Sequence, residues 1–301
     1  MPGAHDGLAG HGINWLPARN GMVLTDPSMT DPLSSKVTRR GIYLLPNLFT
    51  TGAMFAGFYA IVAGILGFFT HAAIAVFIAA LLDGMDGRIA RLTGTQSDFG
   101  VQYDSLSDLI SFGLAPSLVL YTWSLEYLRD YGPVWSKVGW CAAFLYAACA
   151  ALRLARFNTQ VGVADKRYFQ GLASPAAAGL CMSFVWTMEN LRVGGYAVDG
   201  QSLCFFTPIL AVIAGLLMVS RVRYFSFKTL PIGDRVPFVW IILAVLIIVA
   251  LALNPAMVLL ALATTYALSG LVITLWGLRN RASRRRLRAA RRHAPPPDAN
   301  P

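Results

Sequence analysis

Charged residues are scarce in this chain: Asp, Glu, Lys and Arg make up only 13% of its 301 residues, whereas hydrophobic residues make up 56%. So little charge excludes an ordinary soluble domain, in which about a quarter of the residues are charged. The mean hydropathy is +0.55. The composition therefore predicts a polytopic membrane protein with one membrane domain.

Cysteine and histidine are also scarce, with four of each. The cysteines show no Cys-x-x-Cys spacing and all lie in apolar stretches, where a free cysteine behaves as a small hydrophobic residue. The histidines are scattered, which argues against a histidine-based metal site or a nucleophile–base pair. No Walker loop or Rossmann glycine pattern is present either. The residues concerned are Cys141, Cys149, Cys181 and Cys204, and His5, His11, His71 and His293.

Long apolar runs fill most of the chain. Because a hydrocarbon core of about 30 Å needs roughly 20 apolar residues per helix, these runs predict an all-α fold with about eight transmembrane helices. The predicted helices cover residues 46–69, 72–93, 100–123, 138–158, 170–190, 203–220, 237–253 and 256–277. Only Asn254 and Pro255 separate the last two.

The basic residues predict the topology, because Lys and Arg collect in the cytoplasmic loops of membrane proteins. With the N-terminus inside, the external loops contain only Arg129, Lys137 and Arg192 of the 25 basic residues. We therefore expect a multi-pass protein of the inner, cytoplasmic membrane. Both termini and the loop after residue 93 would be cytoplasmic.

The two ends of the chain differ in composition from the membrane domain, which we place at residues 41–278. Residues 1–40 are rich in Gly, Pro, Ser, Asp and Thr, which predicts a disordered cytoplasmic leader without a cleaved signal peptide. Residues 279–301 contain an arginine-rich run, which suits anionic lipid headgroups or serves as a topological anchor. No aromatic residue interleaves these arginines, so nucleic acid is not an expected partner.

Four carboxylates lie inside the predicted membrane helices, where a charged side chain costs roughly 3 kcal/mol or more. Asp83 and Asp86 are three residues apart, so they share one helix face. Asp104 and Asp108 are four apart and share a face of the next helix. Together they can neutralise hard divalent cations such as Mg²⁺ or Mn²⁺, which take oxygen ligands. The sequence therefore predicts a metal site where the two helices converge.

A short turn joins these two acidic helices. Gly94 can end the first helix. Thr95, Ser97 or Asp98 can cap the second. We therefore expect the helices to run antiparallel, with the carboxylates facing each other near one membrane surface.

Small and polar residues flank the carboxylates. Gly87 and Gly100 leave room for a bulky phosphate, and Arg91 can reach the same phosphate with a planar fork of donors. Asn47 and Thr50 begin the first predicted helix, where they can bind a ribose or a cytosine. A helix N-cap explains Asn47 nearly as well.

The acidic motif resembles the signature of the CDP-alcohol phosphatidyltransferases: Asp-x-x-Asp-Gly-x-x-Ala-Arg, eight residues, then Gly-x-x-x-Asp-x-x-x-Asp. The residues at the signature positions are Asp83, Asp86, Gly87, Ala90, Arg91, Gly100, Asp104 and Asp108. Segments 45–51, 104–116, 152–158 and 169–178 are similar to the bacterial and archaeal phosphatidylserine synthase branch. The resemblance implies transfer of the phosphatidyl group from CDP-diacylglycerol to L-serine.

The resemblance also implies a core of six helices, to which the last two predicted helices are an addition. It further implies that the protein is a homodimer and that membrane lipids surround it. Asp108 matches the family residue that acts as the base. Two divalent ions would bridge the diphosphate oxygens. No activated nucleophile lies near the motif, which favours one direct displacement. We expect CDP-diacylglycerol to contact Asn47, Thr50, Asp83, Gly87, Ala90, Arg91 and Gly100.

Serine needs one group for its carboxylate and another for its ammonium, both near the base. Arg153 and Arg156 lie three apart at the end of the fourth predicted helix, and an arginine fork suits a carboxylate. Either arginine is explained equally well as a basic residue at the cytoplasmic end of a helix that extends its charged group to the membrane surface. The predicted acceptor site consists of Arg153, Arg156, Asn158, Gln170 and Ser174.

Two other functions fit parts of this pattern. The same fold with glycerol 3-phosphate, inositol phosphate or choline as the acceptor would keep all four carboxylates and change only the acceptor pocket. A cation transporter would use the carboxylates as an ion path. Against transport, the carboxylates cluster in one helix pair, with no counterpart in a second half of the chain as inverted repeats would give.

Overall fold

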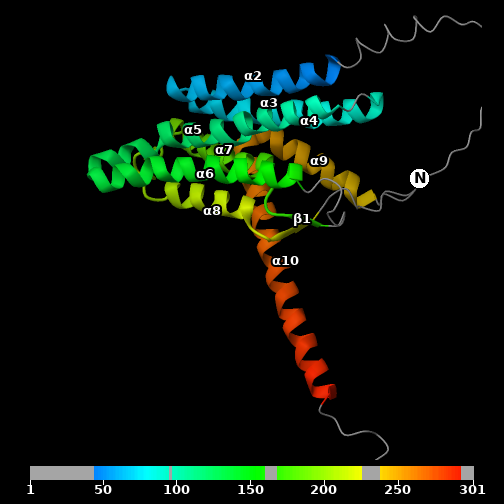
Figure 1. Ribbon diagram of the computed structural model, residues 1–301. Coiled ribbons are helices and arrows are strands. Elements are labelled where there is room, and N and C mark those ends of the chain that lie inside the picture. Colours follow the sequence, from blue (N-terminus) through cyan, green and yellow to red (C-terminus); the bar gives the residue numbers. More distant parts are fainter. Residues whose placement is uncertain (1–43, 95–96, 160–167, 226–237, 293–301) are drawn as a thin grey trace, which may run out of the picture. The chain divides into compact units, whose positions relative to one another are not determined.

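Helices make up almost all of the structure, a computed structural model that describes residues 44–94, 97–159, 168–225 and 238–292. All eight segments predicted to cross the membrane contain helix within these described residues (Figure 1). This arrangement confirms the predicted all-α membrane fold. The predicted leader, residues 1–40, lies outside the described residues.

The elements are labelled in Figure 1 in chain order. The helices are α2 Leu44–Ile65, α3 Phe69–Thr93, α4 Asp98–Asp108, η1 Leu109–Leu114, α5 Ala115–Trp123, η2 Leu125–Tyr131, α6 Pro133–Thr159, α7 Ser174–Val193, α8 Thr207–Val219, α9 Phe238–Leu253 and α10 Pro255–Arg292. The segment η1 is a π-helix, and η2 is a 3-10 helix. Two short strands, β1 Tyr168–Gln170 and β2 Arg223–Phe225, pair antiparallel as a two-stranded ribbon.

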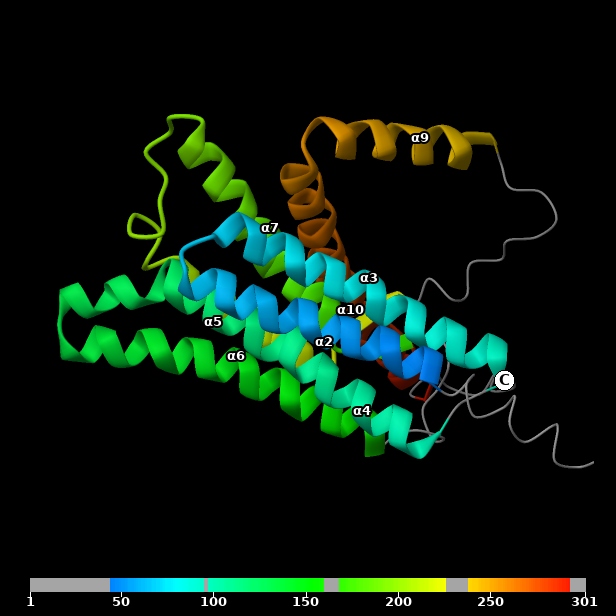
Figure 2. The ribbon, with the colours of Figure 1, turned by 90° about the horizontal axis from the view of Figure 1, so that it is seen from above.

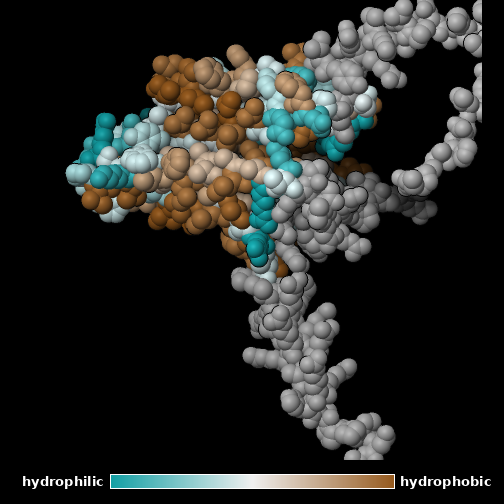
Figure 3. Space-filling view, viewed as in Figure 1, coloured by the Kyte–Doolittle hydropathy of each residue, from teal (hydrophilic) through white to brown (hydrophobic). Residues whose placement is uncertain are grey.

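Several of the described helices have the length and composition of membrane spans. Four qualify on both counts: Pro46–Ile65, Asp98–Trp123, Pro133–Thr159 and Pro255–Thr274. Helices α8 and α9 are shorter but apolar. On the face shown in Figure 3, apolar residues cover the middle of the helices and hydrophilic residues lie at both ends of this band. These features are those of a multi-pass membrane protein.

Several helix boundaries differ from the sequence prediction, including the starts of α7 and α8 and the end of α10. Helix α7 begins at Ser174 rather than at residue 170, because Gly171 adopts a φ of +83° and Pro175 lies in the first turn of the helix. Helix α8 also begins later than predicted, with Pro208 in its first turn. Helix α10 continues to Arg292, so part of the predicted basic tail is helical.

Alanine lines the contact between α2 and α3. Ala56 and Ala60 of α2 and Ala72 and Ala79 of α3 are buried in the core. Small residues let helix backbones approach closely inside a membrane. Helix α2 packs against α4 as well, and Figure 2 shows it between α3 and α4. The two acidic helices are therefore held through α2.

Two serines attach α4 and η1 to α2. Ser107 Oγ donates a hydrogen bond to the Thr50 carbonyl at 3.1 Å, and Ser111 Oγ donates to the Ala53 carbonyl at 3.0 Å. Gly57 makes this contact close, since a Cβ there would lie 2.7 Å from Ser111 Cα. The position of α4 along α2 is therefore fixed by specific contacts.

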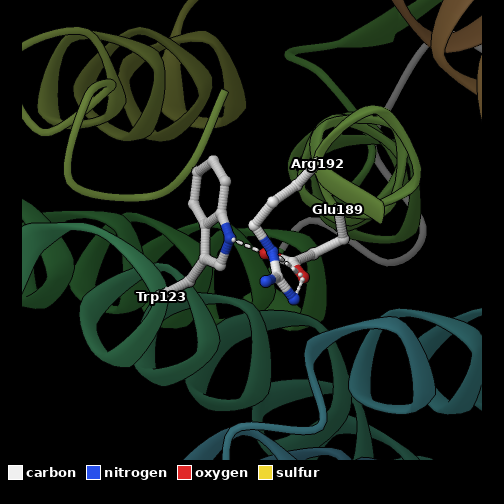
Figure 4. Close-up of polar contacts among 3 residues, drawn as sticks. All are labelled: Trp123, Glu189 and Arg192. Atoms are coloured by element: carbon white, nitrogen blue, oxygen red, sulfur yellow. Dashed lines mark hydrogen bonds and ion pairs between the residues drawn. The ribbon is translucent and has the colours of Figure 1, made fainter. Parts of the chain in front are cut away.

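A buried carboxylate joins the end of α5 to α7 (Figure 4). Glu189 is 7% exposed and accepts a hydrogen bond from Trp123 Nε1 at 2.8 Å. Its other oxygen accepts from Arg192 Nη2, also at 2.8 Å. Ser124 Oγ next to the tryptophan donates to the Gly200 carbonyl at 2.7 Å. These bonds connect α5, α7 and the loop before α8.

Candidate active site

Three of the four carboxylates predicted to bind metal lie together. One oxygen from each of Asp83 in α3 and Asp104 and Asp108 in α4 lies within 4.8 Å of the others. All three residues are half-buried. Asp104 Oδ1 is buried and has no hydrogen-bond partner among the described residues. A buried carboxylate oxygen without a partner is costly, so this set of oxygen donors fits a hard divalent cation.

Asp86 has a different environment from the other three carboxylates. It is 5% exposed, and its Oδ2 accepts a hydrogen bond from Thr50 Oγ1 at 2.7 Å. This bond connects α3 to the first turns of α2. Asp86 also lines a pocket beside the carboxylate cluster, together with Asp104. It is therefore part of the pocket wall.

The pocket has a volume of about 300 Å³ and contains six of the seven residues predicted to bind CDP-diacylglycerol. These six are Asn47, Thr50, Gly87, Ala90, Arg91 and Gly100. The remaining lining residues are Pro46, Asp86, Ser97, Val101 and Asp104. Asp83, the seventh predicted residue, lies in the carboxylate cluster. The pocket and the cluster adjoin at Asp104, which belongs to both.

Two glycines in the pocket lining leave space that a side chain would otherwise fill. A Cβ at Gly87 would meet nothing within 4 Å, so this face of α3 is bare. At Gly100 a Cβ would lie 3.2 Å from Ser97 Oγ and 3.6 Å from Asn47 Oδ1. The turn between the acidic helices agrees with the prediction, because Gly94 ends α3 with a φ of +64° and Ser97 caps α4.

Arg91 supplies the positive charge of the pocket lining. It lies in the last turn of α3, and its Nε donates a hydrogen bond to the Gly87 carbonyl at 2.8 Å. This bond directs the side chain back along its own helix toward the bare glycine face. A guanidinium next to an open backbone surface is a suitable site for a phosphate.

Asp108 ends α4 at the junction with the π-helix η1. A π turn contains one more residue than an α turn and is frequent at functional sites. It changes the direction in which the following side chains point. The charge of Asp108 acts on the Arg153 guanidinium of α6, which places the predicted base close to a predicted acceptor residue.

Two predicted acceptor residues are in direct contact. Arg153 Nη1 donates a hydrogen bond to Ser174 Oγ at 2.8 Å, which links α6 to the first residue of α7. Arg153 Nε is buried without a hydrogen-bond partner in the described part of the chain. The guanidinium therefore retains binding capacity next to Asp108.

The other three predicted acceptor residues are more dispersed. Asn158 Nδ2 donates to Ser105 Oγ at 2.9 Å, which brings Asn158 beside α4. Arg156 Nη1 donates to the Val219 carbonyl at the end of α8, at 3.4 Å. The Gln170 backbone lies in β1 opposite Arg223, and its side chain lies outside the described residues.

Two residues near the predicted acceptor residues were not predicted from the sequence. Ser105 contacts Asn158 directly. Tyr266 of α10 lies within electrostatic reach of Arg153. The apolar segment that contains Tyr266 also contains Thr264, Thr265 and Ser269, so its pattern does not distinguish one hydroxyl from another.

Comparisons with known proteins relate the chain to one family. A sequence model of the CDP-alcohol phosphatidyltransferase family matches residues 43–220, which is more than half of the chain. This match ends with α8, so α9 and α10 lie outside it.

Several relatives carry the same name. The chain is 38% identical over 187 residues to the CDP-diacylglycerol-serine O-phosphatidyltransferase of Helicobacter pylori, a region that covers 62% of this chain and 74% of that protein. It is 34% identical over 164 residues to the protein of that name from Methanocaldococcus jannaschii, with 54% and 68% covered. The protein of that name from Mycobacterium leprae is 30% identical over 201 residues, with 65% and 63% covered.

Proposed function

The chain belongs to the CDP-alcohol phosphatidyltransferase family, and from this premise we propose that it transfers the phosphatidyl group of CDP-diacylglycerol to L-serine and releases CMP. The names of the relatives from Helicobacter pylori and Methanocaldococcus jannaschii support serine as the acceptor. The observation that carries the proposal is the junction of the carboxylate cluster with the pocket at Asp104. A nucleotide in the pocket would have its diphosphate beside the carboxylates.

The pocket residues have suitable chemistry for the nucleotide end of this substrate. Arg91 offers a cation to a phosphate, and the bare backbone at Gly87 lets that phosphate approach α3 closely. Asn47 has an amide that can both donate and accept hydrogen bonds, which suits a ribose or a cytosine. Thr50, Ala90 and Gly100 complete the proposed binding surface.

The carboxylates are the proposed ligands of two divalent cations, Mg²⁺ or Mn²⁺. Asp83, Asp104 and Asp108 offer oxygens from one place, and Asp86 offers a further carboxylate at the pocket wall. When bound, such cations neutralise the charge of the diphosphate and of the departing nucleotide. The unpartnered Asp104 oxygen supports this assignment.

Asp108 is the proposed base. Its carboxylate accepts the proton of the serine hydroxyl while the serine oxygen forms a bond to the phosphorus that carries diacylglycerol. The bond from this phosphorus to the oxygen of CMP breaks, and CMP leaves with the electron pair. The products are phosphatidylserine and CMP, formed in a single displacement.

Arg153 is the proposed partner of the serine carboxylate. Its hydrogen bond to Ser174 and its proximity to Asp108 support this role. Asn158 is supported by its contact with Ser105, the residue after Asp104. Arg156 and Gln170 remain predicted members of the acceptor site.

We also propose a location and an assembly for the enzyme. The distribution of basic residues supports an inner, cytoplasmic membrane protein whose active site and termini face the cytoplasm. The family resemblance supports a homodimer among membrane lipids.

The test is CMP release by the purified protein in detergent, with CDP-diacylglycerol and either Mg²⁺ or Mn²⁺. L-serine is compared with glycerol 3-phosphate, inositol phosphate and choline. Serine-dependent CMP release is the expected result. Release with another acceptor alone would reject serine but retain the transfer chemistry. No release with any acceptor, from protein that unfolds cooperatively on heating, would reject phosphatidyl transfer.

A further inference from the structure

Helix α10 lies outside the family match, yet it reaches the proposed acceptor residues. It packs against α7, whose first residue Ser174 accepts the hydrogen bond from Arg153. Tyr266 of α10 is half-buried, and both Tyr266 and Asp108 lie within electrostatic range of Arg153. Residues of α4, α7 and α10 therefore lie near the guanidinium of Arg153.

Tyr224 of β2 fixes α10 next to this site. Its side chain is fully buried and lies over Gly270, where any Cβ would collide with the tyrosine ring. Its hydroxyl donates to the Ala267 carbonyl at 3.3 Å. Burial raises the pKa of Tyr224 to about 12, so this hydroxyl stays protonated and can donate. The rings of Tyr224 and Tyr266 are 5.3 Å apart between centroids.

The β1–β2 ribbon connects the same contacts to α7. Phe169 of β1 lies opposite Tyr224 of β2. Gly171, between β1 and α7, donates its backbone N–H to the Val222 carbonyl at 2.9 Å. A side chain at Gly171 would collide with the Met218 carbonyl, so the segment lies tightly against the end of α8. The start of α7, the end of α8 and the middle of α10 thus form one connected unit.

We propose that Tyr266 positions the Arg153 guanidinium for the carboxylate of the amino-acid acceptor, so that α10 contributes to acceptor affinity and selectivity. This inference rests on the proposed function and adds a positioning residue to its acceptor site. Ser174 holds one nitrogen of the guanidinium from α7, and Tyr266 lies near it on α10. A guanidinium that is bound by one element and confined by a side chain of another loses less freedom when it binds a carboxylate.

The first test compares the wild-type protein with Tyr266→Phe, which removes only the hydroxyl. We expect the KM for L-serine to rise about tenfold, which corresponds to about 1.4 kcal/mol of acceptor binding, while kcat and the KM for CDP-diacylglycerol stay within about twofold. The matched control is Tyr196→Phe, since Tyr196 is 65% exposed in the loop after α7. This control should leave all three constants unchanged.

A second test separates acceptor recognition from a general loss of packing. L-serinamide has the serine hydroxyl but no carboxylate, so the wild-type enzyme should prefer L-serine strongly. Tyr266→Phe and Gly270→Ala, the second of which displaces Tyr224, should both reduce this preference. A general packing defect would lower turnover of both acceptors equally, and this outcome would overturn the inference.

The outcomes distinguish this inference from the proposed function. If the wild-type protein shows no serine-dependent CMP release, the proposed function fails and the inference fails with it. If wild-type release depends on serine and Tyr266→Phe leaves the KM for L-serine unchanged, only the role of Tyr266 is overturned.

Discussion

The four signature carboxylates occupy two environments, although the sequence shows them as two equivalent pairs. Asp83, Asp104 and Asp108 present oxygens to one another. Asp86 instead accepts a hydrogen bond from Thr50 at the pocket wall. Grouped like charges repel unless a cation or a proton compensates them. Substitutions within the group of three should therefore affect metal binding and turnover to different extents.

Replacing the proposed base should separate these two properties. In Asp108→Asn the amide cannot accept the serine proton, so we expect turnover to fall by about 10² to 10⁴, the usual contribution of a general base. Asp83 of α3 and Asp104 of α4 still offer carboxylates from both helices, so Mn²⁺ binding, measured by electron paramagnetic resonance, should persist. Asp83→Asn removes the one carboxylate that α3 contributes to the cluster, so it should weaken Mn²⁺ binding as well as turnover. Turnover of Asp108→Asn equal to wild type would remove Asp108 from the role of base.

The bare face of α3 allows a second residue-scale prediction. In Gly87→Ala the added methyl group projects into the pocket, so the KM for CDP-diacylglycerol should rise about tenfold, as expected for a loss of about 1.4 kcal/mol. Gly84→Ala is the matched control, because its Cβ also meets nothing within 4 Å but the residue does not line the pocket. Initial rates of CMP release at saturating serine give both constants. Equal values for the two variants would argue against the pocket as the nucleotide site.

At the scale of elements, specific polar contacts fix the helices that carry the site. Ser107 and Ser111 bind backbone carbonyls of α2 on either side of Asp108, and η1 begins directly after Asp108. Interhelical hydrogen bonds of this kind contribute about 1 kcal/mol each in a membrane, which is enough to select one register of two packed helices. Asp108, the proposed base, thus takes its position from helix packing.

The buried contact between α5 and α7 should contribute to stability and leave the chemistry intact. Glu189→Ala leaves Trp123 Nε1 buried without a partner, so we expect the free energy of unfolding to fall by about 1–3 kcal/mol. Thermal unfolding of the detergent-solubilised protein measures this change. The control is Asp130→Ala, because the ion pair of Asp130 with Arg129 is 3.8 Å long and exposed, and such pairs contribute little. Equal unfolding temperatures for the two variants would contradict a structural role of Glu189.

For the whole molecule, the sequence predicts best what depends on local pattern. Apolar runs located all eight helical segments, and the spacing of the acidic motif predicted the grouping of Asp83 with Asp104 and Asp108. The predicted start of α7 was less accurate, because the chain first forms the β1 strand and the turn at Gly171. Hydropathy contains no information about such backbone geometry. The proximity of Tyr266 to Arg153 was not predictable, since it depends on how α10 packs against α7.

The direction in which the chain crosses the membrane determines which side supplies the substrates. The positive-inside rule predicts that the turn between α3 and α4 lies in the cytoplasm and that the loop after α7 lies outside. Asp98 and Tyr196, both exposed, report on these two places. A Cys141→Ser background removes the exposed cysteine, since the other three cysteines are buried.

In intact cells, a membrane-impermeant maleimide should label Tyr196→Cys but not Asp98→Cys in this background. Permeabilisation should expose Asp98→Cys to the reagent, because the cytoplasmic face then becomes accessible. Retained CMP release by both variants would show that the labelled proteins are folded. The opposite labelling pattern would place the carboxylate cluster on the outer surface, away from cytoplasmic CDP-diacylglycerol and serine, and would contradict the proposed orientation of the active site.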